Sequence, residues 1–243
     1  MAIRAITFDF WMTLFEESNR EERHQIRVDA FCDATGAHRG AVDLALQEAH
    51  DRFFRVHVNE QRTLAPADAV RMVCESIAIT LTPETFDELA TFFGTAIYTH
   101  PPTPIAGALE AVQAAAARVP IGIISDSGMS PGTSLRTLLD RHGFTPYFTT
   151  LTFSDELGVA KPQAPMFEKT AAALGVAPQE LLHLGDLEPT DIKGVQAVGG
   201  VGGLFAGAND RFAPTTRAEH TFHHWNEFLA VLPELVPENV KAD

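Results

Sequence analysis

Five residues whose side chains could do chemistry lie at the ends of predicted strands or the starts of predicted helices. Asp9 ends the first apolar run of the chain, and Ser125 ends the second. Lys161 precedes a predicted helix, while Asp186 and Asp191 flank a strand-to-helix turn. In an open parallel sheet, ligands bind outside the carboxyl ends of the strands. The pattern therefore predicts that these side chains meet at one edge of a sheet.

The residue types in this set favour a magnesium and phosphate site. Mg²⁺ is usually held by one or two carboxylates together with waters and a substrate phosphate, and Asp9 with Asp186 offers such a pair. Ser125 and Lys161 would then hold the other phosphoryl oxygens and offset the charge that develops in the transition state. Taken singly, each residue also has a structural explanation, as a turn residue, a surface lysine or a helix cap. Only their combination indicates a site.

A sheet is needed to position these residues, and the second part of the chain has the pattern for one. Apolar strands alternate with amphipathic helices, which is typical of a parallel sheet covered on both faces. We therefore predict an α/β fold with a doubly wound (Rossmann-like) parallel sheet core. The expected strands after the first cover residues 119–125, 148–153, 181–185 and 200–205, and the expected helices cover 107–118, 132–142, 165–174, 191–198 and 224–232.

A helical insertion is predicted between the first and second strands. Four helices follow one another there without a strand between them, and Pro66 and Pro83 open the third and fourth. The proline-rich residues that follow form a stiff connector back to the sheet. We expect an α/β core at 1–15 and 105–236, a helical-bundle cap at 16–98, a connector at 99–104 and a tail at 237–243.

Charge and composition limit the class of partner. The 243 residues carry a net charge of −14, shared equally between residues 16–98 and the rest of the chain. No basic face is expected, so we predict no binding to nucleic acid or membrane. An acidic protein that handles an anionic substrate needs local positive charge, from a metal or a few placed cations. Lysine is scarce, with four residues in all.

The expected location is the cytoplasm. Cys32 and Cys74 are the only cysteines, and their spacing fits neither a zinc site nor a redox pair. No apolar segment has the length of a signal peptide or a membrane span. The sequence does not decide between a monomer and a homodimer.

The order of the polar residues resembles the four motifs of the haloacid dehalogenase (HAD) superfamily. The resemblance covers essentially the whole chain, including a helical cap between the first and second motifs that would select the substrate. The matching segments are Asp9-Phe10-Trp11-Met12-Thr13, Ser125, Lys161 with Pro162, and Gly185-Asp186 followed by Asp191.

This resemblance implies a role for each motif. Asp9 would be the nucleophile and form an aspartyl-phosphate, while Ser125 and Lys161 would bind the phosphoryl group of a small phosphorylated metabolite. Mg²⁺ would be held by Asp9, the backbone carbonyl of Trp11 and Asp186, with Asp191 in the outer shell.

One departure from the family pattern concerns proton transfer. HAD phosphatases usually carry a second Asp two residues after the nucleophile, as the general acid and base, and here that position is Trp11. An indole cannot replace it, and such catalysis contributes roughly 10²–10⁴-fold to rate. Asp126 and Glu188 are the candidate substitutes. Met12 also stands where glycine is common.

Two other functions stay open at this point. HAD dehalogenases place an aromatic residue at the position of Trp11, and there Asp9 would attack a carbon bearing a halogen. The Asp186–Asp191 pattern argues against that branch, because it belongs to the metal-dependent members. A third possibility is a protein that binds a phosphorylated ligand without turnover. We further expect Glu156 to orient the Lys161 ammonium by ion pairing.

Overall fold

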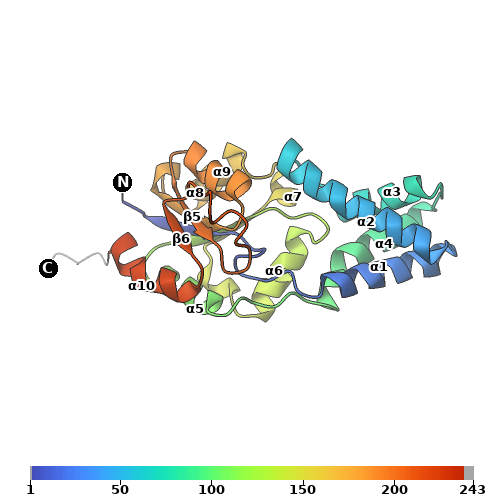
Figure 1. The fold of residues 1–243 in the computed structure, drawn as a ribbon, viewed down its shortest axis with the longest axis horizontal. Coiled ribbons are helices and arrows are strands. Elements are labelled where there is room, and N and C mark those ends of the chain that lie inside the picture. The colour runs from blue at the N-terminus through green and yellow to red at the C-terminus, as the bar shows by residue number, and fades with distance from the viewer. Residues whose placement is uncertain (1, 238–243) are drawn as a thin grey trace.

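A six-stranded parallel sheet forms the centre of the computed structural model, which describes residues 2–237 (Figure 1). The strand order is β3-β2-β1-β4-β5-β6, so the chain winds outward in both directions from β1. This confirms the predicted α/β fold with a doubly wound parallel sheet. The strands are β1 (Ala5–Phe8), β2 (Ile121–Ser125), β3 (Thr150–Phe153), β4 (Leu181–Gly185), β5 (Val201–Phe205) and β6 (His220–Phe222).

Helices cover both faces of the sheet. Successive side chains of a strand point to opposite faces, so Ile6 and Phe8 pack on one side and Ala5 on the other. The first side is covered by α5 (Ala108–Ala116), α6 (Gly132–Arg141) and α10 (Trp225–Leu235). The second side is covered by α8 (Ala164–Ala173) and α9 (Lys193–Ala197). Burial on both faces explains why the strands are apolar runs.

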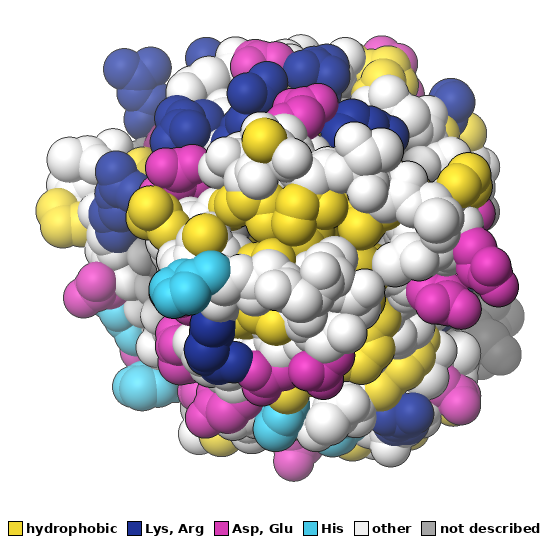
Figure 2. All heavy atoms as spheres, turned by 90° about the vertical axis from the view of Figure 1, so that its right-hand side faces the viewer, with side chains coloured by type: hydrophobic (Ala, Val, Ile, Leu, Met, Phe, Trp, Pro, Cys, Tyr) yellow, Lys and Arg dark blue, Asp and Glu magenta, His cyan; other side chains and the backbone are white. Residues whose placement is uncertain are grey.

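Four helices between β1 and α5 form a bundle with its own hydrophobic core, which includes Phe31, Val70 and Phe93. They lie together beside the sheet, at the right of Figure 1. Figure 2 shows the outer end of this bundle, where basic, acidic and apolar side chains lie side by side. The helices are α1 (Arg20–Thr35), α2 (Arg39–Arg55), α3 (Pro66–Ser76) and α4 (Pro83–Thr95).

Some expected features fall outside these observations. The exact division into core and cap stays a prediction, as do the cytoplasmic location and the oligomeric state. The predicted tail lies outside the described residues from residue 238 onward. Within residues 2–237, no helix combines the length and the hydropathy that a membrane span requires.

Three elements differ from the sequence prediction. Strand β6 was not expected, because three residues are too few to show a two-residue period. The helical period predicts that the second helix of the bundle runs to about residue 60, whereas α2 ends at Arg55 and continues as one π-helical turn, Val56–Glu60. A second π-helical turn, Glu188–Ile192, precedes α9. Single π turns often occur at functional sites, and both of these border the cavity described below.

His50, on α2, is a half-buried titratable group of the bundle. Its ring centroid lies 5.4 Å from that of His24. Burial, together with the nearby Arg27 and His24, lowers the pKa of His50 from 6.5 to about 3. The folded protein therefore keeps this imidazole neutral.

Replacing His50 by Gln should flatten the pH dependence of stability in mild acid. Below pH 6.5 the unfolded chain protonates His50 and the folded chain does not, so wild-type stability falls as the pH drops from 6.5 toward 3. The loss is at most about 1.4 kcal/mol per pH unit. Urea unfolding between pH 7 and pH 4 should show a smaller loss for His50→Gln than for the wild type. The exposed His38→Gln should behave as the wild type; equal slopes for all three would contradict this account.

Candidate active site

Three adjacent strands bring the predicted carboxylates and hydroxyl to one edge. Strand β1 lies between β2 and β4, with Phe8 paired to Ile123 on one side and Leu184 on the other. The residues that follow these strands therefore project from the same edge. The amide of Asp9 donates to the carbonyl of Leu184 at 2.8 Å, which ties the turn after β1 to β4.

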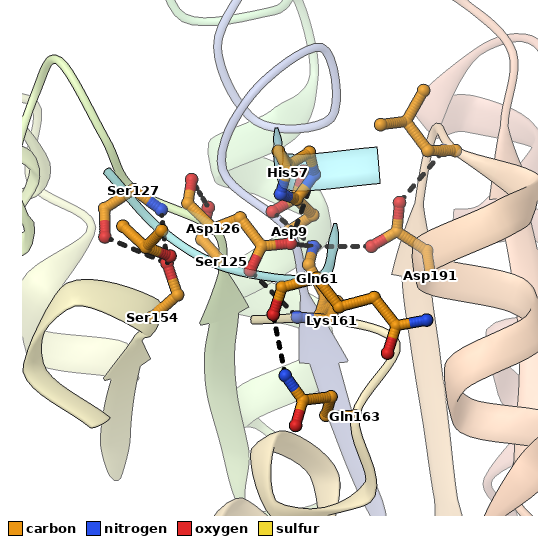
Figure 3. A network of polar contacts seen from close by, with 12 residues as sticks. Asp9, His57, Gln61, Ser125, Asp126, Ser127, Ser154, Lys161, Gln163 and Asp191 are labelled. Atoms are coloured by element: carbon orange, nitrogen blue, oxygen red, sulfur yellow. Dashed lines mark hydrogen bonds and ion pairs between the residues drawn. The ribbon is translucent and has the colours of Figure 1, made fainter. Parts of the chain in front are cut away.

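The Lys161 ammonium lies at the centre of the site (Figure 3). Its Nζ donates to Oδ1 of Asp9 at 2.8 Å and to Oδ1 of Asp191 at 2.5 Å, and it lies 4.0 Å from Oδ2 of Asp126. The side chain is 2% exposed. Burial alone would lower the pKa of Lys161, but the surrounding carboxylates raise it above its usual value. The lysine is therefore a fixed positive charge.

Asp191 is a fully buried anchor for this lysine. It shares a hydrogen bond with Nε2 of His183 at 3.0 Å and accepts one from the amide of Leu187 at 2.9 Å. Burial would raise its pKa, but Lys161 and His183 outweigh burial and hold the pKa of Asp191 below its usual range. Gly185 makes room for it, because a Cβ there would come within 2.2 Å of the Asp191 carboxyl carbon.

The carboxylates fit a divalent cation. Asp9, Asp186 and Asp191 offer oxygens that all lie within 4.8 Å of one another. Burial, then Asp191 and Asp9, raise the pKa of Asp186 well above its usual value, because several carboxyl groups share this space with one ammonium. Oδ2 of Asp186 accepts from Asn209 at 2.6 Å. Among the described residues, nothing donates to Oδ2 of Asp9 or Oδ1 of Asp186, which leaves two oxygens for a metal.

A cavity of about 410 Å³ opens between this edge of the sheet and the helical bundle. The sheet edge contributes Asp9, Lys161 and Asp186 to its wall, and the bundle contributes arginine, histidine and phenylalanine side chains. Those from the bundle and its loops include Arg20, Arg23, Arg27, His50, Phe53, Phe54, His57 and Arg62.

Ser125 is at the predicted edge but does not line this cavity. It is fully buried, and its hydroxyl lies 3.5 Å from the carbonyl of Asp126.

Trp11 does line the cavity, and Met12 beside it has a φ of 53°. This left-handed conformation explains why glycine suits the position.

Asp126 is the better placed of the two candidate substitutes for the missing acid. Oδ1 accepts from the backbone amide of Lys161 at 2.9 Å, and Oδ2 lies 3.5 Å from Nε2 of His57 on the π-helical turn after α2. Burial raises the pKa of Asp126 to about 6, despite Lys161 and His57. Glu188 instead accepts from Thr216 and Arg217 and does not line the cavity.

The expected Glu156–Lys161 pair is wrong. Glu156 binds Arg136, with Nη2 to Oε2 at 2.6 Å, because the lysine points inward to the buried carboxylates.

Sequence reasoning also missed His183, Asn209 and His57 as neighbours of the site. His183 has a local signal, since it lies in the strand that ends at Asp186; Asn209 and His57 come from distant segments and have none.

The comparisons with known proteins agree with this arrangement. Residues 3–199 match the family of haloacid dehalogenase-like hydrolases. The chain is 36% identical over 93 residues to pyrimidine 5′-nucleotidase YjjG of Escherichia coli, covering 38% of this chain and 40% of that protein. It is 38% identical over 61 residues to glyceraldehyde 3-phosphate phosphatase of Methanopyrus kandleri, covering 25% and 26%. The matches thus span well under half of these curated relatives.

Solved structures share the fold over nearly the whole chain. A 2-haloacid dehalogenase from Pseudomonas syringae has a TM-score of 0.71 at 15% identity, covering 96% of this chain and 99% of that one. A HAD phosphatase from Thermococcus onnurineus has a TM-score of 0.65 at 20% identity, covering 95% and 98%. Both phosphatase and dehalogenase names occur at similar scores, so this likeness shows the fold alone.

Replacing Lys161 by Met should destabilise the protein strongly. Asp9 and Asp191 would then be buried without their counter-charge, and breaking a buried ion pair costs about 3–5 kcal/mol. Urea unfolding in the presence of a chelator measures the loss. Lys169→Met, an exposed lysine on α8, is the control and should change stability by less than about 0.5 kcal/mol. Similar losses for the two variants would contradict the central role of Lys161.

Proposed function

We propose, on the premise that this chain belongs to the haloacid dehalogenase-like hydrolase family, that it is a Mg²⁺-dependent phosphatase acting on a small phosphorylated metabolite. The observation that carries the proposal is the buried carboxylate cluster around Lys161 at the cavity wall. A phosphate ester with a divalent cation complements that cluster in charge. Relatives with phosphatase and nucleotidase names support the same class of reaction.

In the proposed reaction, Asp9 is the nucleophile. Lys161 donates to Oδ1 and orients the carboxylate, one oxygen of which attacks phosphorus. The P–O bond to the leaving group breaks, the alcohol takes up a proton, and an aspartyl-phosphate forms. Water then attacks the same phosphorus, which releases inorganic phosphate and restores the carboxylate.

Lys161 and Ser125 are the proposed ligands of the phosphoryl group. The lysine brings a permanent positive charge to the developing negative charge. Ser125 is fully buried and does not line the cavity, so its hydroxyl would reach the phosphoryl group only after a local shift of the turn that follows β2. Its hydrogen bond to the Asp126 carbonyl is long, at 3.5 Å, and would be readily exchanged for a stronger acceptor. Asp9, Asp186 and the backbone carbonyl of Trp11 would hold Mg²⁺, with Asp191 in the outer shell. The ion supplies charge neutralisation and orients the phosphate.

Asp126 is our proposed carrier of the proton that Trp11 cannot transfer. It lines the cavity next to Lys161, and its raised pKa allows it to be protonated near neutral pH. As an acid it would protonate the leaving alcohol, and as a base it would accept the proton of the attacking water. The helical bundle, including His57, would close over the substrate as a cap.

Dehalogenation is the second candidate, and the aromatic Trp11 at the cavity wall favours it. Against it stands the carboxylate pattern of Asp186 and Asp191, which a halide-displacing site does not need. Halide release from 2-chloropropionate in the presence of a chelator would establish this candidate. Tight Mg²⁺-dependent binding of a phosphate ester without product would instead establish a binding protein.

Replacing Asp9 by Asn should abolish phosphate release. The amide keeps the shape of the side chain but cannot attack phosphorus, so turnover of p-nitrophenyl phosphate should fall by at least about 10³-fold. Wild-type turnover should also need Mg²⁺ and stop with a chelator. Asp33→Asn, an exposed residue of the bundle, is the matched control. Chelator-resistant turnover, or an active Asp9→Asn protein, would contradict the proposal.

Replacing Asp126 by Asn should slow the hydrolysis of esters with poor leaving groups most. An alkyl alcohol needs a proton as it leaves, whereas p-nitrophenolate does not, so kcat should fall about 10²–10⁴-fold for an alkyl phosphate. The first step with p-nitrophenyl phosphate should change much less, as measured in single turnovers. Adding Trp11→Asp to this variant should restore part of the loss. Equal losses for both leaving groups would exclude Asp126 as the acid.

A further inference from the structure

The cavity has a cationic wall opposite the carboxylates. Helix α1 presents Arg20, Arg23 and Arg27 to it, at spacings of three and four residues, which place them on one helix face. Arg20 is largely exposed and lies 3.9 Å from Glu17. The other two arginines are buried.

Arg23 is 3% exposed and holds its guanidinium beside Trp11, 6.0 Å from the ring centroid. Its Nη1 donates to the carbonyls of Ser18 and His100, at 2.7 and 2.9 Å. Burial lowers its pKa from the usual value. These acceptors are neutral, so they satisfy donors without balancing the charge.

Arg27 is also 3% exposed, and it too has only a neutral partner. Nε and Nη2 both donate to the carbonyl of Phe93, at 3.0 and 2.9 Å. Among residues 2–237, no acceptor faces its Nη1, and no carboxylate forms an ion pair with either Arg23 or Arg27. Burial, and then Arg23, lower the pKa of Arg27 to about 9.

Two buried like charges without a counter-ion are costly to a fold. Burial of a cation is normally compensated by a paired anion, and neighbouring guanidiniums also repel each other. His50 beside them is held neutral and adds no negative charge. Glu17 lines the same cavity and, with Glu22 in the case of Arg23, partly offsets the lowering of the arginine pKa values. It is about half exposed, however, and its ion pair, at 3.9 Å, is with Arg20. An anionic ligand in the cavity would supply the missing charge.

We propose that Arg23 and Arg27 bind a second anionic group of the substrate, a carboxylate or a second phosphate, while Asp9 and Lys161 act on the transferred phosphoryl group. This inference rests on the proposed phosphatase function and names its substrate class. The geometry connects the two ends, since Arg23 lies against Trp11, two residues from Asp9. Guanidinium forks suit both carboxylate and phosphate.

Matched substrates test the proposal. 2-Phosphoglycolate and ethyl phosphate differ by a carboxylate in place of a methyl group, and 1,3-propanediol bisphosphate and propyl phosphate differ by the second phosphate. The wild type should favour the doubly anionic member of at least one pair by about tenfold or more in kcat/KM, and the pair with the larger ratio identifies the second anion. Arg27→Met and Arg23→Met should bring that ratio close to one, mainly through KM.

Control variants distinguish the loss of a specific arginine charge from general damage to the fold. Arg52→Met removes an exposed arginine of α2 that does not line the cavity, and it should keep the wild-type ratio. Arg23→Lys and Arg27→Lys keep the charge and should retain part of the preference. If Arg27→Met does not fold, Arg27→Lys and Arg23→Met show whether the substrate preference depends on these arginines, because both variants keep a buried cation in the bundle.

Binding measured by calorimetry distinguishes a failure of the anion site from a failure of the phosphatase function. Binding of 2-phosphoglycolate, 1,3-propanediol bisphosphate and their singly anionic partners in Mg²⁺ buffer needs no turnover. If no ester is hydrolysed but the arginine-dependent preference for the doubly anionic ligand persists, the phosphatase function is wrong and the anion site stands. Equal affinity within both pairs, or a preference that survives in both Met variants, overturns the anion site even if phosphate is released.

Discussion

The buried ammonium of Lys161 is the interaction on which the site depends. It bridges Asp9 and Asp191 from a loop that follows neither of their strands, so it joins three separate segments at one point. A charge of this kind is stable in the interior only with its partners in place. Asp191 is in turn fixed by His183 and the Leu187 amide, and Gly185 leaves the space that it occupies.

The excess of carboxyl groups over positive charges around Lys161 explains why the site would favour binding of a cation. Asp9, Asp126, Asp186 and Asp191 face one ammonium, and the pKa values of Asp126 and Asp186 are raised in consequence of their burial. At the point where the proposed phosphoryl transfer needs a metal, the protein thus holds more carboxyl groups than its one lysine can keep ionised, and a divalent ion would favour their ionised form.

The bundle side of the cavity has the opposite imbalance. Arg23 and Arg27 are buried against neutral carbonyls, and the neighbouring His50 is kept uncharged. A ligand that combines a metal-bound phosphate with a second anion matches both walls. The net charge of −14 does not reveal that one cavity wall is acidic and the other basic, because it is a sum over the whole chain.

Sequence alone determined five of the six strands, the helical insertion and the order of the motifs. Apolar runs and helical periods are local properties, and Asp9, Ser125 and Asp186 stand at strand ends that any parallel sheet brings together. Tertiary structure decided the rest. Glu156 pairs with Arg136 rather than with Lys161, and Ser125 does not line the cavity.

Contacts between the bundle and the sheet were likewise beyond the sequence. The pairing of His57 with Asp126, and the place of Arg23 beside Trp11, depend on how two separately packed cores are set against each other. A helical period shows that the α1 arginines share a face, but not whether water or a cavity lies in front of them. That difference decides whether an arginine is an ordinary surface charge or a buried one that needs an anion.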